Sequence, residues 1–324
     1  MFAMARTFRR RVGMLVSLQV ICLVAAAQPA LALEEVLISY AGPSITFLPA
    51  EVARQRGFFR EQNLDVKLLL TRTEVDRAAL ASGSIYYSLR AGSSFVSAAR
   101  GLPVRIVYLG TTKPFWGLVV RPEIKSVSEL KGKSMGVPGL LGSQQISAKF
   151  ILRQNGLDPD RDVIYRIVDT GTRIGAMLSG AIDCSMMDYG EAFRAKKVGL
   201  KFLINAADYH GLIAGGLGVN TAQLRDHGDQ VRRVIRALVQ AHRYLRDNPE
   251  GTQQAMINWL KIDKEMAADI YQMSINNYTR NGMVEEATMN SLVRSMLADA
   301  GIKGATPSQL TDFTLLHQAL KQPQ

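Results

Sequence analysis

Residues 35–70 read EVLISYAGPSITFLPAEVARQRGFFREQNLDVKLLL and contain one strand–helix–strand pattern. The run 35–40 is short, apolar and β-rich, and Gly42-Pro43 follows it as an exit turn follows a strand. Residues 48–56 place Val52 and Ala53 on one helical face, and Gly57 comes next as a helix-ending glycine. The apolar run 64–70 is the second strand. This order predicts a largely parallel sheet with covering helices.

The alternation continues and then gives way to helices. Helices are predicted at 74–81 and 94–100, and strands at 85–89 and 104–109. From Thr221 onward the apolar spacing is helical, and helices are predicted at 231–246, 251–259, 264–278, 285–300 and 306–320. The chain therefore combines an α/β body with a helical C-terminal tail.

A short internal repeat indicates that the α/β plan occurs twice. Ser82-Gly83-Ser84-Ile85 resembles Ser179-Gly180-Ala181-Ile182, 97 residues later, and Gly101-Leu102 resembles Gly199-Leu200, 98 residues later. Equal offsets are expected when two lobes repeat one plan. Two such lobes would face each other across a cleft, where α/β folds bind small molecules.

The first 32 residues have the pattern of a secretory signal. Arg6, Arg9, Arg10 and Arg11 form a basic start, residues 12–27 are nearly all apolar, and Ala30 and Ala32 are small residues at an A-x-A site. The apolar run is shorter than the roughly 20 residues of a membrane helix. We expect cleavage after about Ala32 and a periplasmic protein, with the general or the twin-arginine export route left open.

Composition limits the function once this segment is set aside. The chain has 324 residues, 39 basic against 28 acidic residues, and two cysteines. Without the four arginines of the signal, 35 basic residues remain against 28, a net charge of +7, and Cys184 is the one remaining cysteine. Cys184 lies in an apolar run and is predicted to be a buried small hydrophobe. No intrachain disulfide, clustered metal ligands, G-x-S-x-G elbow or basic nucleic-acid cluster is expected.

Several motifs together resemble one family of binding proteins. They are Leu48-Pro49-Ala50-Glu51-Val52-Ala53 with Gly57-Phe58-Phe59, Glu129-Leu130-Lys131-Gly132-Lys133 with Gly136-Val137 and Gly142-Ser143, Leu152 with Gly156-Leu157, and Ala237, Ala241, Leu245 and Asn248-Pro249-Glu250. The chain is similar to the periplasmic substrate-binding proteins of nitrate, sulfonate and taurine ABC importers, a group that includes thiamine-precursor-binding proteins.

The resemblance implies an α/β, two-lobed binding protein of type II, each lobe a mainly parallel sheet with flanking helices. Lobe 1 would comprise 33–118 and 215–324 with the tail, and lobe 2 would comprise 119–214. It implies a monomer without catalytic residues, cofactor or metal, which captures a small anion by closing its lobes and docks on a membrane permease.

Turns that leave strands and open helices present free N–H groups that attract an anion. Four turns have suitable residues, and a fifth loop at Asp188-Tyr189 corresponds to a ligand loop of the family. The predicted ligand-binding residues are Ser44, Ser93, Ser94, Gly142, Ser143, Gln144, Thr172, Arg173, Asp188 and Tyr189.

Three of these side chains suggest specific contacts with a ligand. Arg173 can hold an oxyanion in bidentate fashion, Asp188 can pair with an amine, and Tyr189 can stack on a ligand. For any single arginine, Arg72 and Arg90 included, a solvated surface position is the simpler expectation. Phe115 and Trp116 are predicted as hinge packing or as an aromatic wall.

Other ligands and classes remain open. Tyr86 and Tyr87 stand where the family often has an aspartate, which allows a ligand larger or more aromatic than nitrate. A thiamine pyrimidine precursor or an aromatic compound is the alternative ligand. Two alternative classes of protein were weighed. One is a thiamine-pyrimidine synthase-like enzyme, but this chain lacks the cysteine-rich motif of those enzymes. The other is the effector domain of a transcription regulator, but the signal stands where a DNA-binding segment would be needed.

Overall fold

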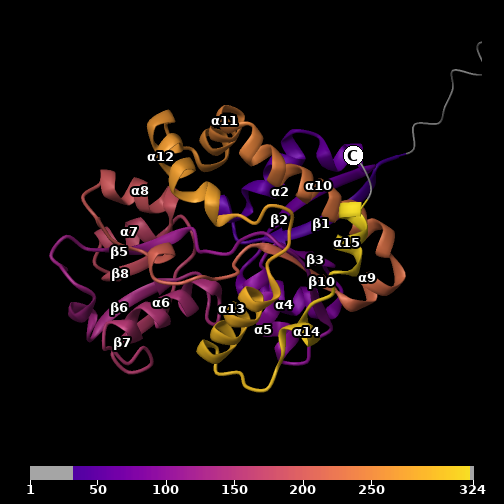
Figure 1. Ribbon diagram of the computed structural model, residues 1–324. Coiled ribbons are helices and arrows are strands. Elements are labelled where there is room, and N and C mark those ends of the chain that lie inside the picture. Colours follow the sequence, from indigo (N-terminus) through magenta and orange to yellow (C-terminus); the bar gives the residue numbers. More distant parts are fainter. Residues whose placement is uncertain (1–31, 322–324) are drawn as a thin grey trace, which may run out of the picture. The chain divides into compact units, whose positions relative to one another are not determined.

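The computed structural model describes residues 32–321, so the predicted signal lies, except for Ala32, outside the described residues. Of the described residues, 35–321 belong to one compact unit. The description below concerns this unit, which contains two β-sheets and their helices (Figure 1).

The first sheet has the strand order β2-β1-β3-β10-β4. Its strands are β1 (Glu34–Tyr40), β2 (Leu64–Leu70), β3 (Tyr87–Ser88), β4 (Val104–Leu109) and β10 (Gly216–Asn220). Strand β3 is parallel to β1, whereas β10 is antiparallel to both of its neighbours. Strand β3 is shorter than the predicted run 85–89, and β4 has the predicted bounds.

The second sheet repeats the same order as β7-β6-β8-β5-β9. Its strands are β5 (Trp116–Val120), β6 (Lys133–Val137), β7 (Val163–Ile167), β8 (Cys184–Asp188) and β9 (Lys201–Asn205). Strand β6 is parallel to β7 and β8, and β5 is antiparallel to β8 and β9. The first residues of β3 and β8, Tyr87 and Cys184, are 97 positions apart. The repeat predicted from the sequence is therefore confirmed.

Each sheet is mixed because one strand enters it in the opposite direction. Strand β5 follows the last parallel strand of the first sheet and inserts between β8 and β9, and β10 inserts between β3 and β4. Strand β5 spans the expected boundary between residues 118 and 119, and all of it pairs within the second sheet.

Helices cover both sheets. Before the tail they are α2 (Leu48–Gln55), α3 (Phe58–Glu61), α4 (Thr73–Ser82), α5 (Ala91–Ala99), α6 (Ser143–Gln154), α7 (Arg173–Leu178) and α8 (Tyr189–Lys197). The tail contains α9 (Thr221–Asp226), α10 (Gly228–Asp247), α11 (Pro249–Leu260), α12 (Lys264–Ser274), α13 (Glu286–Asp299), α14 (Pro307–Leu310) and α15 (Thr314–Lys321). Short 3₁₀ turns are η1 (Ile45–Phe47), η2 (Val127–Leu130), η3 (Ala206–Asp208) and η4 (Ile275–Asn277).

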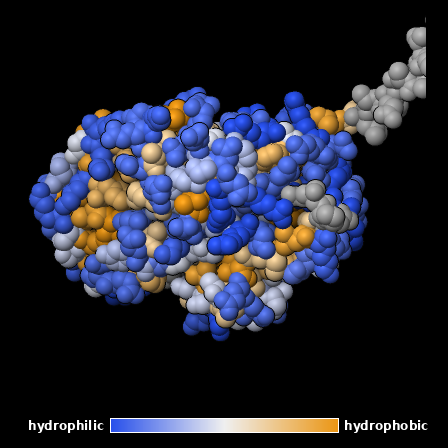
Figure 2. Space-filling model, turned by 45° about the horizontal axis from the view of Figure 1, so that its top comes forward, coloured by the Kyte–Doolittle hydropathy of each residue, from blue (hydrophilic) through white to orange (hydrophobic). Residues whose placement is uncertain are grey.

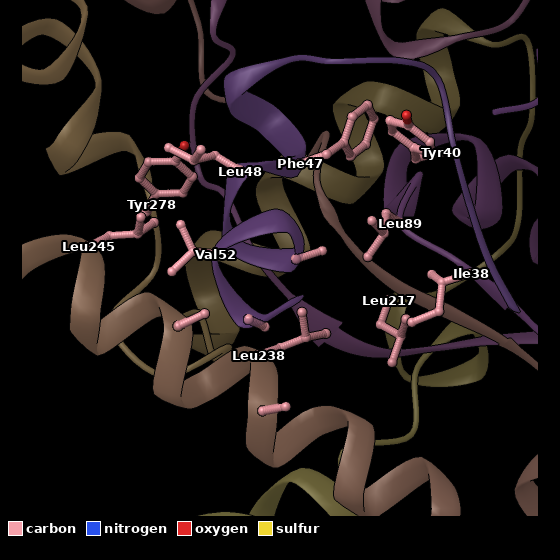
Figure 3. Close-up of a cluster of buried hydrophobic side chains, with 14 of the residues drawn as sticks. Ile38, Tyr40, Phe47, Leu48, Val52, Leu89, Leu217, Leu238, Leu245 and Tyr278 are labelled. Atoms are coloured by element: carbon pink, nitrogen blue, oxygen red, sulfur yellow. The ribbon is translucent and has the colours of Figure 1, made fainter. Parts of the chain in front are cut away.

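Helix α10 joins the tail to the first sheet. Its predicted apolar stripe is buried, and the stripe consists of Val231, Val234, Leu238, Ala241 and Leu245. Leu238 and Leu245 pack in one core with Val52 of α2 (Figure 3). Since an amphipathic helix gains most of its stability from such a buried face, the tail is part of this core.

The prediction of one continuous helix at the end of the tail is wrong. Residues 306–320 form α14 and α15, because Thr311 between them is extended and makes a parallel bridge to Ile106 of β4. The predicted helix 264–278 likewise ends as an α-helix at Ser274.

Two further features follow the sequence. Cys184 is a free, fully buried cysteine, as predicted, and burial raises the pKa of its thiol. In the described part of the chain, none of the helices combines the length and apolar character needed to span a membrane. Polar side chains dominate the face drawn in Figure 2, with apolar side chains gathered in separate patches.

Candidate functional site

A cavity of about 70 Å³ lies between the two sheets, where several of their strands end. The first-sheet side supplies the turn after β1 and the start of α5, and the other side supplies the loop after β6 and the end of β8. Its lining consists of Ala41, Gly42, Ser44, Thr46, Phe47, Thr73, Arg90, Ser93, Trp116, Pro138, Gly142, Ser143, Gln144, Thr170, Arg173, Asp188 and Ala214. Carboxyl ends of strands are where open α/β sheets bind ligands.

A second cavity of about 270 Å³ adjoins the first one. The two share Ala41, Gly42, Arg90, Pro138 and Thr170. The second cavity extends toward Leu70, Arg72 and Asp169. We call them the inner and the outer cavity.

The inner cavity brings together seven of the predicted binding residues: Ser44, Ser93, Gly142, Ser143, Gln144, Arg173 and Asp188. The other three, Ser94, Thr172 and Tyr189, do not line it. Each predicted turn thus contributes at least one residue to the lining, and whether these residues bind a ligand stays a prediction.

Local geometry explains these three positions. Ser94 is buried against β10, where a side chain at Gly218 would meet its Oγ at 2.3 Å. Thr172 is exposed, and its hydroxyl donates to the Asp169 carbonyl at 2.8 Å. Tyr189 is fully buried in the core, and its hydroxyl donates to Asn205 Oδ1 at 2.6 Å.

Arg173 is not a free guanidinium on a turn. It is the first residue of α7, is 0% exposed, and forms an ion pair with Glu191 of α8. It also donates to the Met186 carbonyl at 2.5 Å and to Gln144 Oε1 at 2.7 Å. Most of its donors are thus occupied by the protein, so its charge is already balanced before a ligand arrives.

Arg90 is the buried cation that keeps its charge available. It is 8% exposed, and no carboxylate of residues 32–321 contacts its guanidinium. The guanidinium donates to the Thr73 hydroxyl at 2.9 Å and to the carbonyls of Tyr40 and Thr71. Burial lowers the pKa of Arg90, and the Asp76 carboxylate acts against this from beyond contact distance. The expectation of a solvated surface position is wrong for Arg90 and for Arg173.

Three residues of the cavity lining each have a hydrogen-bond donor without an acceptor. Arg90 Nε, Arg173 Nε and Trp116 Nε1 are buried and have no acceptor among the described residues. All three are N–H groups that can only donate. A buried donor without an acceptor costs about 1–3 kcal/mol, and the described conformation leaves that cost unrelieved at all three groups.

Asp188 forms a direct link between the two sheets. It ends β8 and caps α8 through Gly190 N, and its Oδ2 accepts the Ser44 hydroxyl at 2.5 Å. Burial raises the pKa of Asp188 to about 6, and the Ser44 hydrogen bond works against that rise. The carboxyl group is therefore close to its titration point at mildly acidic pH.

Two further contacts join the two sides of the cavities. Arg72, after β2, forms a two-pronged ion pair with Asp169, after β7, at 3.1 and 2.5 Å. Gly92 of α5 approaches Ser143 of α6 so closely that a Cβ at Gly92 would lie 2.1 Å from Ser143 Oγ. The described conformation is thus one in which the two sides touch.

Sequence reasoning missed part of the lining. Thr73 and Phe47 gave no signal, because a threonine or phenylalanine at a helix end is ordinary. Trp116 was considered as hinge packing or an aromatic wall, and it lines the cavity, whereas Phe115 packs on Tyr278 at 4.6 Å. Arg90 was detectable, since it follows a strand and opens a helix as the chosen serines do.

Among residues 32–321, no group of three or more His, Cys, Asp or Glu side chains is arranged to hold a metal ion. Two of the histidines make other contacts within the fold: the ring Nε2 of His210 is hydrogen-bonded to the Ser147 hydroxyl at 2.7 Å, and His242 lies in the core beside Tyr108 and Tyr278.

Solved structures share this fold. The chain superimposes on the nitrate-binding protein NrtA from Synechocystis PCC 6803 with a TM-score of 0.73 and 12% identity, covering 90% of this chain and 89% of the other. For the alkanesulfonate-binding protein SsuA from Xanthomonas axonopodis pv. citri bound to MOPS, the TM-score is 0.65 at 17% identity, covering 91% and 99%. The predicted α/β plan of a two-lobed type II binding protein is confirmed, and each mainly parallel sheet contains one antiparallel strand, β10 or β5.

The sequence relatives align with a smaller part of the chain than the solved structures do. The riboflavin-binding protein RibY of Chloroflexus aurantiacus is 26% identical over 221 residues, which is 65% of this chain and 62% of that protein. A 4-amino-5-hydroxymethyl-2-methylpyrimidine phosphate synthase of Candida albicans is 30% identical over 145 residues, 43% of this chain and 41% of the synthase. The chain thus aligns with less than two thirds of the length of either relative.

One family model spans most of the α/β body and the start of the tail. It is described as NMT1/THI5 like and matches residues 44–252. The matched range begins at the cavity residue Ser44 and continues into α11. It therefore includes the turns from Ser44 onward that line the cavity on both sides. The chain therefore belongs to the NMT1/THI5-like family.

Proposed function

We propose that this protein is the exported solute-binding component of an ABC importer and that it captures a small organic anion in the inner cavity. The main support for this proposal is the position of Arg90. Its buried guanidinium lines both cavities, and no carboxylate among the described residues contacts it. An anionic ligand would supply the missing counter-charge. Charge-assisted hydrogen bonds of this kind are about twice as strong as neutral ones.

The polar groups around Arg90 favour the same ligand class. Gly142 precedes α6, whose first N–H groups have no partners within the helix, and Gly142, Ser143 and Gln144 at this helix start all line the inner cavity. Arg173 and Glu191 cancel each other, so they add little net charge. Among the described residues, Asp188 is the carboxylate that lines the inner cavity, and Asp76 acts on Arg90 from beyond contact distance. The raised pKa of Asp188 weakens its opposition to an anion at acidic pH.

The remaining walls suit an apolar ligand body. Phe47, Trp116, Pro138 and Ala214 line the inner cavity beside the donors. A few placed polar groups among apolar walls are typical of small-molecule sites. Sulfonates and related organic acids fit this combination better than nitrate, which has no apolar part.

The transport cycle that we propose uses the two sheets as lobes. The sequence predicts a boundary between residues 118 and 119, but all of β5 pairs within the second sheet, so the boundary that we propose lies before Trp116. Lobe 1 would then comprise 33–115 and 215–324, and lobe 2 would comprise 116–214, after removal of the signal 1–32 and release to the periplasm. The ligand binds both lobes only when they are shut, so it shifts the population toward the closed form. The closed monomer would then dock on a permease in the inner membrane, and we assign no catalytic residue.

A second ligand class is supported by the aromatic walls. Phe47 and Trp116 could flank a flat heterocycle such as a thiamine pyrimidine precursor, and the Asp188 carboxylate could accept its N–H groups. RibY and the Candida synthase are named for heterocyclic compounds. Such a ligand would leave the Arg90 charge without a counter-ion, which is why we place it second.

A thermal-shift screen of the protein lacking residues 1–32 tests the proposal. The panel contains benzenesulfonate, taurine, nitrate, benzoate, hydroxymethylpyrimidine, riboflavin and a quaternary ammonium compound. A ligand at a hundredfold excess over Kd stabilises by about 2.7 kcal/mol, which raises the melting temperature measurably. Anions should produce the shifts, and a response confined to neutral or cationic compounds would overturn the proposal.

Three variants test whether the anion binds at the cavity. Arg90→Gln should abolish the anion-dependent shift, whereas Arg100→Gln should retain it, because Arg100 is exposed at the other end of α5. Arg90→Lys keeps the charge and should retain part of the response, which separates loss of the cation from loss of the fold.

A further inference from the structure

Two aromatic side chains of the helical tail hold the turn that carries Ser44. Trp259 of α11 donates its indole N–H to the Ser44 carbonyl at 3.2 Å. Tyr278, after α12, donates its hydroxyl to the carbonyl of the next residue, Ile45. Two consecutive main-chain carbonyls of a cavity turn are thus fixed by residues that are more than 200 positions away and do not line the cavity.

Both donors are themselves held in place by ring contacts. The Trp259 ring stacks on Tyr40, the last residue of β1, with centroids 5.7 Å apart and an angle of 24°. Tyr278 is 3% exposed and packs on Phe115 at 4.6 Å and on His242 at 5.5 Å. Burial keeps the pKa of Tyr278 well above its usual value, so its hydroxyl stays protonated and can donate.

The same corner of the tail also contacts the other side of the cavity. Leu260, beside Trp259, accepts from Arg194 of α8 at 2.7 Å, and Asp263, which caps α12, pairs with Lys197 of α8. Helix α8 begins next to Asp188, the acceptor of the Ser44 hydroxyl. A closed chain of contacts therefore runs from Ser44 through Asp188 and α8 to the α11–α12 corner and back to Ser44.

We infer that Trp259 and Tyr278 are positioning residues of the binding site, which set the Ser44 hydroxyl against Asp188 and so keep the two sides of the cavity in register. This inference rests on the proposed function for its effect on affinity. Its effect on the Ser44–Asp188 contact does not depend on any ligand.

The tail offers a matched control for this role. Tyr271 of α12 also donates its hydroxyl to a main-chain carbonyl, that of Leu245 at 3.1 Å, and it is 6% exposed. Its bond lies between tail helices and does not reach a cavity residue. Tyr278→Phe and Tyr271→Phe therefore remove the same kind of hydrogen bond, one connected to Ser44 and one not.

The first readout is the titration of Asp188, followed by its carboxyl carbon resonance and assigned with Asp188→Asn. The groups that interact with Asp188 are Ser44, Gly190 N–H, Glu191, Arg194, Tyr189 and Tyr278. Because the Ser44 hydrogen bond lowers the pKa of Asp188, Tyr278→Phe and Trp259→Phe should raise that pKa, and Tyr271→Phe should leave it unchanged. A structural role alone would not move this titration.

The second readout is the Kd of benzenesulfonate, taken at temperatures where all variants are folded. Loss of one positioning bond should weaken binding about three- to tenfold, as expected for a single hydrogen bond, and Tyr271→Phe should bind as the wild type does. If Tyr278→Phe fails to fold, Trp259→Phe against Tyr271→Phe decides the question.

The outcomes separate the two claims. The inference is overturned if Tyr278→Phe and Trp259→Phe match Tyr271→Phe in both readouts. If the Asp188 titration shifts as expected while no anion binds the wild type, the positioning role stands and the proposed function fails.

Discussion

The Ser44 hydroxyl donates to the Asp188 carboxylate at 2.5 Å, which joins the turn after the first strand of one sheet to the end of the third parallel strand of the other. The carboxylate is buried at this junction and has a raised pKa. A protonatable group between the two sides of the cavity makes both stability and anion binding depend on pH.

Asp188→Asn should stabilise the ligand-free protein at neutral pH. The folded-state pKa of Asp188 is raised from 3.8 to about 6, so the stability it contributes is complete below about pH 4 and is lost as pH rises through 6. Two units correspond to at most about 3 kcal/mol, and we expect a gain of about 1–3 kcal/mol at neutral pH. Urea unfolding across this pH range measures it.

The same substitution at Asp229 is a control for which we expect the opposite change in stability. Hydrogen bonds from Arg232 and Arg233 lower the pKa of Asp229, so Asp229→Asn should lose stability at neutral pH. Equal pH profiles for wild type and Asp188→Asn would contradict the assignment of a buried, titrating carboxyl group.

Arg173→Ala should be strongly destabilising, because it leaves Glu191 buried without its partner. Removing one member of a buried pair costs about 3–5 kcal/mol. The pair is nearly inaccessible, with side-chain exposures of 0% and 4%, so solvent cannot replace the guanidinium. Chemical denaturation gives the free energy of unfolding.

The double variant Arg173→Met with Glu191→Gln should recover part of that loss, since neither remaining side chain is charged. An Arg173→Ala protein that unfolds like the wild type would show that the pair does not form in solution.

The Arg72–Asp169 ion pair should favour the closed form only weakly. Its side chains are 68% and 45% exposed, and solvent screens such exposed pairs so that they contribute little. Asp169→Asn should therefore raise the Kd of benzenesulfonate about two- to fivefold at low salt, and the difference should vanish near 1 M salt. Calorimetric titration at both salt concentrations checks this.

A comparable pair within one sheet serves as the control. Lys67 and Glu35 are each 56% exposed and join the neighbouring strands β1 and β2. Glu35→Gln should leave the affinity unchanged. An equal effect of both substitutions would show that Asp169 does not act through contact between the two sides.

Local patterns in the sequence were sufficient to predict most of the strands and the repeat. Strand β4 has the predicted bounds, and β1 begins one residue earlier than predicted, because short apolar runs with clear turns specify strands locally. The 97-residue offset was enough to predict that both sheets follow one order.

Contacts between distant residues could not be predicted in this way. The split of 306–320 depends on the bridge from Thr311 to Ile106, which no local pattern encodes. Arg173 was recognised as a candidate cation, but its partner Glu191 lies 18 residues away on another element. Arg173 is paired with Glu191, whereas Arg90 has only neutral acceptors among the described residues, and only the folded arrangement shows that difference.

The most direct test of the account compares matched ligands at neutral pH by calorimetric titration. Benzenesulfonate is paired with benzenesulfonamide and benzoate with benzamide, each against wild type and Arg90→Gln. We predict that the anion of at least one pair binds the wild type about tenfold or more tightly than its amide, and that Arg90→Gln loses this preference. Equal binding of anion and amide, or an unchanged preference in Arg90→Gln, would contradict capture of an anion by Arg90.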